Sequence, residues 1–172
     1  MTTRSNEIVP TKVTRYPEST DGNVAGNSVD KDMLTVSVSE SGDGEGWLKL
    51  EFDKAYLLDQ VIVYSNFYSN WYGSVNDTCQ NTVAGYQSCK ELTTGVTIHI
   101  LDGDGEQIGY CGTLEMAQGL QREDQIYRFV CNAEGAGIRL YFEGSGRLAI
   151  NEIVVTARTG EPTIFRINDC QT

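Results

Sequence analysis

The chain has 172 residues, enough for one domain with a well-buried core but too few for two domains of ordinary size. Its 18 glycines, 3 prolines and hydrophobic fraction of 40% argue against disorder and favour short strands joined by tight turns. The formal net charge of -11 repels phosphate groups, so we expect neither nucleic acid nor an anionic membrane as a partner.

Alternating hydrophobicity predicts a first strand at residues 47–52, with Leu48, Leu50 and Phe52 on one face. A continuous apolar run at 61–64 is typical of a strand that is buried on both faces. These two segments are the first of a series of short strands.

A strand is also predicted at 96–101, and Asp102-Gly103-Asp104-Gly105 then forms a tight turn. One face of that strand consists of Val96, Ile98 and Ile100, and the other of Thr97, His99 and Leu101. Only one short helix is conceivable, at 113–121. Short strands at this spacing predict a β-sandwich, and the others lie at 108–111, 126–131, 138–142 and 153–157.

Two long polar and aromatic segments, 21–46 and 65–91, interrupt the strands. Loops of this length are usually functional, so we expect the binding surface there. The predicted domain spans 13–158, after a lead segment at 1–12 and before a tail or linker at 159–172.

Five cysteines without any Cys-x-x-Cys pair, in a chain with one histidine, argue against zinc and for disulfides. Disulfides imply an oxidising compartment, and the sequon Asn76-Asp77-Thr78 agrees with a secreted or cell-surface glycoprotein. No stretch approaches the roughly 20 apolar residues that span a bilayer, so membrane insertion is not expected. Two bridges would leave one thiol over, and Cys170 is a candidate for linking chains.

Catalytic residue combinations are missing from the sequence. It has no Gly-x-Ser-x-Gly motif and no zinc motif, and its lone histidine, His99, lies in the middle of a predicted strand. Paired carboxylates of a glycosidase would need a larger cleft than so short a chain suggests. We therefore predict a binding protein and not an enzyme.

Several motifs recur in the order that is known from one family: Asp21-Gly22-Asn23, Gly46 to Phe52, Gly95 to Ile98, Cys111 with Cys131, and Leu148 to Val155. In this order the chain resembles the F-type lectins, or fucolectins, within the discoidin-like galactose-binding domains, over roughly residues 13–157. The resemblance implies an all-β, jelly-roll-like antiparallel β-sandwich.

The resemblance also implies a structural calcium ion. The family chelates it with side-chain and main-chain oxygens, which suits an ion that takes six to eight hard ligands. Without the family, Asp21-Gly22-Asn23 is simply a good turn, and Asp102 to Gly105 and Gly42 to Glu45 are taken for turns too. The stretch 32–37 should add a ligand, so the predicted set is Asp21, Asn23, Glu152, Glu18, Asn151, Asp32 and Thr35.

The same resemblance implies a disulfide between Cys111 and Cys131, and the remaining pair is then Cys79 with Cys89.

Fucose-binding members of the family hold the sugar with one histidine and two arginines. Here Ser65-Asn66 and Leu92 stand where the arginines are expected, and His99 looks like an ordinary sheet residue, so usual fucose specificity is not expected. In place of the arginines, the segment 66–90 offers aromatic and amide side chains, which stack on sugars or anchor protein partners. The alternative is that the aromatic residues pack the loop onto the sandwich. The predicted ligand contacts are Asn66, Tyr68, Asn70, Trp71 and Tyr72.

Two functions remain in view. The first is an extracellular, calcium-stabilised carbohydrate-binding module for a glycan or glycoprotein, with weak single sites that gain avidity from multivalency. The second is a protein-binding adhesion or matrix module on the same fold, which would use the aromatic loop as its contact surface.

Overall fold

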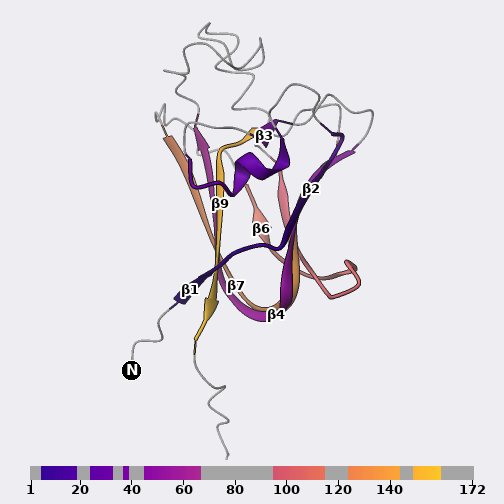
Figure 1. The fold of residues 1–172 in the computed structure, drawn as a ribbon, viewed down its shortest axis with the longest axis vertical. Helices are drawn as coiled ribbons and strands as arrows, with labels where there is room; N and C mark the ends of the chain where they lie inside the picture. Colours follow the sequence, from indigo (N-terminus) through magenta and orange to yellow (C-terminus); the bar gives the residue numbers. More distant parts are fainter. Residues whose placement is uncertain are drawn as a thin grey trace, which may run out of the picture.

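The computed structural model describes residues 5–18, 24–32, 37–38, 45–66, 95–114, 124–143 and 149–159. Every pairing between its strands is antiparallel. Within these ranges no helix has the length and apolar character needed to cross a membrane. The elements, drawn in Figure 1, are β1 (Ser5–Ile8), β2 (Lys12–Tyr16), the 3-10 helix η1 (Ala25–Ser28), β3 (Ser37–Val38), β4 (Glu45–Asn66), β5 (Thr97–Leu101), β6 (Gln107–Thr113), β7 (Asp124–Glu143), β8 (Ala149–Ile150) and β9 (Glu152–Arg158).

Two long strands, β4 and β7, bend in the middle and take part in both layers of the sandwich (Figure 1). Residues 45–51 of β4 pair with 137–143 of β7, and residues 56–66 pair with 124–135. The sequence predicts separate strands at 47–52 and 61–64, whereas the structure contains a single strand with a bulge between them. The reason is that residues 53–60 contain no glycine or proline, so the chain bends without turning back.

Glycines allow β7 to bend against its neighbours. A Cβ atom on Gly135 would lie 2.5 Å from Cγ2 of Ile100, and one on Gly137 would lie 2.7 Å from the main-chain oxygen of Leu50. Both distances are too short for any side chain, so the backbone reaches this position only with glycine. The predicted strands 126–131 and 138–142 are therefore the two halves of β7.

The strand order of the main sheet is β1-β9-β4-β7-β5-β6, and β2 pairs with the first half of β4. A second, two-stranded sheet joins β3 to β8. β1 pairs with β9, and its Ile8 is 6% exposed and belongs to the core. The lead segment predicted at 1–12 thus adds a strand to the sheet from Ser5 onward, and the tail from residue 160 lies outside the described residues.

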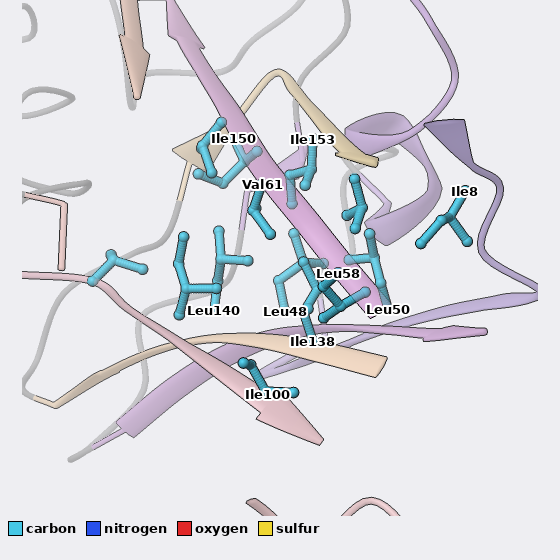
Figure 2. Packing of buried hydrophobic residues seen from close by; sticks show 14 of the residues in the cluster. Ile8, Leu48, Leu50, Leu58, Val61, Ile100, Ile138, Leu140, Ile150 and Ile153 are labelled. Atoms are coloured by element: carbon cyan, nitrogen blue, oxygen red, sulfur yellow. The ribbon is translucent and has the colours of Figure 1, made fainter. Parts of the chain in front are cut away.

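The core lies between the two layers and confirms the predicted inward faces of the strands. Leu48, Leu50 and Phe52 are buried, as are Ile98 and Ile100. Burying a side chain of this size stabilises the fold by roughly 2 kcal/mol. Figure 2 shows how the core side chains gather, with Ile8, Leu48, Leu50, Leu58, Val61, Ile100, Ile138, Leu140, Ile150 and Ile153 labelled.

Leu101 departs from the predicted alternation. It is expected on the outer face with His99, but it is 1% exposed. A register shift between Ile100 and Leu101 in the β5–β6 pairing turns the side chain inward. The following turn is as predicted, because the Asp102 carboxylate accepts hydrogen bonds from the main-chain N–H groups of Asp104 and Glu106, both at 2.9 Å.

Candidate functional site

A buried carboxylate, Glu152, stands at the start of β9 and is only 5% exposed. Its Oε2 accepts a hydrogen bond from the main-chain N–H of Lys31 at 3.0 Å. Burial raises the pKa of Glu152 to about 7; the carboxylates of Asp30 and Glu7 also raise it, and the Lys31 contacts act against them. Loss of water therefore makes the ionised form of this side chain costly unless a cation compensates its charge.

The Asp30-Lys31-Asp32 segment forms the turn that faces Glu152. The main-chain N–H of Asp32 donates to Asp30 Oδ1 at 2.9 Å, and Lys31 has a positive φ of 64°. This left-handed conformation directs the Lys31 N–H at Glu152 Oε2. The Lys31 ammonium instead pairs at the surface with Glu7, at 3.2 Å.

Ser37 and Asn151 bring further oxygen atoms to the same end of the sandwich. Ser37 in β3 pairs with Ile150, two residues before Glu152. It is 1% exposed, and its hydroxyl has no hydrogen-bond partner among the described residues. Asn151 is 2% exposed, and its main-chain N–H donates to the Tyr64 carbonyl at 3.0 Å. A buried hydroxyl without a partner is costly, so the place suits an oxygen-seeking ligand.

The structure brings three of the predicted calcium ligands into one neighbourhood: Glu152, Asn151 and Asp32. Glu18 follows β2, is exposed, and forms no hydrogen bond with this group among the described residues. Asp21, Asn23 and Thr35 lie outside the described residues. Within the described ranges, no three His, Cys, Asp or Glu side chains form a metal-binding group. The calcium site thus stays a prediction that also needs main-chain, hydroxyl and amide oxygens.

Two residues of this neighbourhood, Asp30 and Ser37, are missing from the predicted ligand set. Asp30-Lys31-Asp32 has the same acid-x-polar spacing as Asp21-Gly22-Asn23, but lysine replaces the glycine that normally occupies a positive φ. Because lysine is uncommon at such a position, the sequence does not predict the turn at Lys31. Ser37 ends the stretch that was expected to supply a ligand, and its burial, which the sequence does not reveal, distinguishes it from its neighbours.

The predicted disulfide between Cys111 and Cys131 is confirmed, with a Cα–Cα distance of 4.7 Å. It joins β6 to the first half of β7 across 20 residues of sequence. The predicted partners Cys79 and Cys89 lie outside the described residues. So do the predicted ligand contacts Tyr68, Asn70, Trp71 and Tyr72, whereas Asn66 ends β4 opposite Asp124.

His99 points outward from the middle of β5, as predicted, and takes part in a network with its neighbours. Its Nε2 lies 3.0 Å from Thr97 Oγ1, and Thr97 Oγ1 donates to the Tyr141 carbonyl at 3.2 Å. The hydroxyl hydrogen is therefore used, so Nε2 carries the proton and Nδ1 accepts from Arg139 Nη2 at 3.3 Å. Burial first, and Arg139 second, lower the pKa of His99, which agrees with this neutral tautomer.

The described residues thus define an all-β sandwich with a buried carboxylate at one end and a polar network on one outer face. Comparison with solved structures shows that the fold is the discoidin-like galactose-binding fold, as the resemblance implied. By sequence, no protein-family model and no curated protein matches the chain.

Three similar structures illustrate the match. A histidine mutant of the lectin-binding domain of Lectinolysin, complexed with Lewis b, has a TM-score of 0.65 and 12% identity, covering 92% of this chain and 100% of that chain. An F-lectin (fucolectin) from striped bass (Morone saxatilis) serum has a TM-score of 0.61 and 14% identity, covering 92% and 50%. A pectin-binding carbohydrate-binding module has a TM-score of 0.60 and 18% identity, covering 90% and 96%.

Proposed function

We propose that this chain is an extracellular carbohydrate-binding module stabilised by calcium, and that it has no catalytic activity of its own. The fold is shared with structures described as complexed with Lewis b and as pectin-binding. The observation that carries the proposal is the buried Glu152 carboxylate at the start of β9, together with Ser37, which pairs with Ile150 two residues earlier and whose buried hydroxyl has no hydrogen-bond partner among the described residues. Fold alone does not determine function, so the proposal depends on the residues of the site.

The residues present fit a calcium ion. Glu152 would supply the charged ligand, Asn151 a main-chain oxygen, and Ser37 and Asp30, which were not predicted, further side-chain oxygens. The proposal keeps the other predicted ligands, Asp21, Asn23, Glu18, Asp32 and Thr35. When bound, calcium would compensate the negative charge that burial makes costly. It would also join the segment at 30–37 to β9, which fixes one end of the sandwich. We therefore assign the ion a structural role.

We assign glycan contact to the segment that follows β4, where Asn66, Tyr68, Asn70, Trp71 and Tyr72 were predicted. The sequence has neither of the two expected arginines of the fucose-binding trio, and its only histidine is held in the β5 network. We therefore expect a specificity that differs from that of usual fucose-binding members. Weak single sites would gain avidity through further domains or chains, and Cys170 is a candidate link.

A glycan array probed with the full chain tests this function. In calcium we expect binding to at least one glycan, reduced by Trp71→Ala and weakened by a chelator. An exposed aromatic residue away from that segment, as in Tyr110→Ala, provides the control and should leave the array pattern unchanged. A chain that binds no glycan in calcium would refute the proposal.

A protein-binding function is the second candidate, and one observation favours it. Four large apolar side chains on β6 and β7 are at least 49% exposed. Exposed apolar groups of this size are common at protein interfaces. Capture of a specific protein partner that is lost on Ile108→Ala, without any glycan binding, would favour this second function. The exposed residues are Ile108, Tyr110, Ile126 and Val130.

A further inference from the structure

Aligned strand registers create a polar and aromatic surface on the outer face of β4, β7 and β5. Trp47 pairs with Tyr141, which pairs with Thr97 on the other side. Two residues earlier in β7, Arg139 pairs with Lys49 of β4 on one side and with His99 of β5 on the other. Side chains two residues apart on a strand share a face, so both rows project to the same side of the sheet. They line a pocket of about 660 Å³.

The floor of this pocket is aromatic. Trp47 stacks on Tyr16 of β2, with ring centroids 6.1 Å apart, and His99 stacks on Tyr141 at 5.4 Å. Rings fixed by such neighbours provide apolar area at low entropic cost. A row of fixed rings beside a few polar groups is the usual composition of a small-molecule site, and the volume falls within the common range of about 300–1,000 Å³.

Arg139 is the cation among the described residues that line the pocket, and it has hydrogen-bond donors to spare. Its Nη2 donates to His99 Nδ1 at 3.3 Å, and its guanidinium carbon lies 5.6 Å from the centroid of the Tyr141 ring. No described carboxylate forms an ion pair with it, and its buried Nε has no hydrogen-bond partner among the described residues. His99 is thus a positioning residue that holds the guanidinium, whose remaining donors are available to a ligand.

Two carboxylates lie at the opposite end of the pocket. Glu45 and Glu143 face each other across β4 and β7, and the Tyr141 hydroxyl lies 3.3 Å and 3.4 Å from their respective oxygens. One hydroxyl hydrogen satisfies one of them at a time, which leaves acceptor oxygens exposed in the pocket. Among the described lining residues, two carboxylates outweigh one guanidinium beside a neutral imidazole, and Lys49, the β4 partner of Arg139 on the same face, is itself paired with Glu51 at 3.5 Å, so the negative charge is in excess.

We propose that this outer-face pocket is a second glycan-binding site, separate from the segment after β4, and that it takes one or two neutral sugar units. Trp47 and Tyr141 contact the apolar faces of the rings, Arg139 and Gln107 donate to sugar oxygens, and Glu45 and Glu143 accept from hydroxyls. Uronic acids are disfavoured, because their carboxylates meet a negative pocket. The inference rests on the proposed function and adds a location and a ligand class to it.

Arg139→Ala tests this site in the full chain with calcium, by titration with a neutral probe, methyl β-galactoside or methyl α-fucoside, and a charged one, galacturonate. We expect Arg139→Ala to weaken neutral-sugar binding at this site about tenfold or more, since hydrogen bonds to a charged group are lost, while binding that depends on Trp71 persists. Trp47→Ala should act in the same way. Arg128→Ala, an exposed arginine in the other half of β7, is the matched control and should bind within about twofold of the original chain.

Thermal melts establish that each variant is folded, and Arg139→Lys, which keeps the charge but loses the planar fork, should restore binding only in part. Neutral binding that keeps its full affinity and stoichiometry in Arg139→Ala and is lost entirely in Trp71→Ala would overturn the inference and leave the proposed function intact. A preference for galacturonate would contradict the inference that negative charge in the pocket disfavours uronic acids. Failure to bind any glycan would refute the proposed function together with this site.

Discussion

Replacing Glu152 with glutamine tests whether the carboxylate at the start of β9 destabilises the fold when no cation is bound. In calcium-free protein the pKa of Glu152 is raised from 4.5 to about 7, chiefly by burial. A raised pKa means that the folded state holds the proton more tightly than the unfolded state does. The contribution of Glu152 to the stability of the calcium-free fold is therefore fully present below about pH 4.5 and is lost as the pH rises through about 7.

The pKa difference gives the size of the effect. It corresponds to about 3 kcal/mol lost from the free energy of unfolding once the carboxylate is ionised. Glutamine keeps an oxygen that accepts from the Lys31 N–H without a charge, but it gives up the attraction between Lys31 and the carboxylate. We therefore expect Glu152→Gln in a chelator at pH 8 to be more stable than the original chain by about 1–3 kcal/mol. At pH 5 the difference should nearly vanish.

Urea denaturation at both pH values, with and without calcium, measures these differences. Glu134→Gln removes an exposed carboxylate from β7 and controls for the change in net charge, with an expected effect within about 0.5 kcal/mol. In calcium the order should reverse, because only the original chain gains from the ion. A Glu152→Gln variant that is less stable than the original chain in chelator at pH 8 would show that ionised Glu152 does not destabilise the calcium-free fold as predicted.

Calcium should raise the melting temperature of the original chain but hardly that of Glu152→Gln, and an equal rise in calorimetric scans of both would place the ion elsewhere. Burial and Arg139 lower the pKa of His99, so in calcium the fold should lose stability as the pH falls below about 6.5. His99→Gln should lessen this loss in urea melts at pH 7 and pH 5, and an unchanged dependence of stability on pH would argue against a partly buried neutral imidazole. Gly137→Ala should cost about 2 kcal/mol or more, because its Cβ would lie 2.7 Å from a main-chain oxygen, whereas Gly103→Ala, with open space, should be nearly neutral. Equal urea midpoints for these two would contradict the packing. Cys111→Ser should cost about 3 kcal/mol in oxidising buffer, and reducing agent should then change its midpoint far less than that of the original chain.

Much of the fold is predictable from local patterns. The alternation of Leu48, Leu50 and Phe52 assigns one face to the core, and the glycine-rich turn after β5 lies where the sequence places it. The disulfide between Cys111 and Cys131 was predicted from family resemblance and is present. The sequence does not reveal that β4 and β7 each continue as one strand through a bend. The bulges and the close backbone contacts at Gly135 and Gly137 depend on neighbours far away in the chain.

The candidate sites are harder to predict, because they are assembled by strand register. Trp47, Tyr141 and Thr97 are neighbours only after three strands have paired, and no sequence spacing links them. Lys31 is misleading for a different reason, because it occupies a left-handed conformation that normally identifies glycine. Long-range pairing and local strain of this kind are visible only in the folded chain.

Isothermal titration calorimetry of the full chain with neutral glycans, before and after calcium is removed, tests the central claim most directly. We predict saturable binding of a neutral sugar in calcium, weakened in chelator and in Trp71→Ala, with the affinity of the second site alone falling about tenfold or more in Arg139→Ala. A chain that takes up calcium without any stabilisation and releases no heat with any glycan would contradict the account.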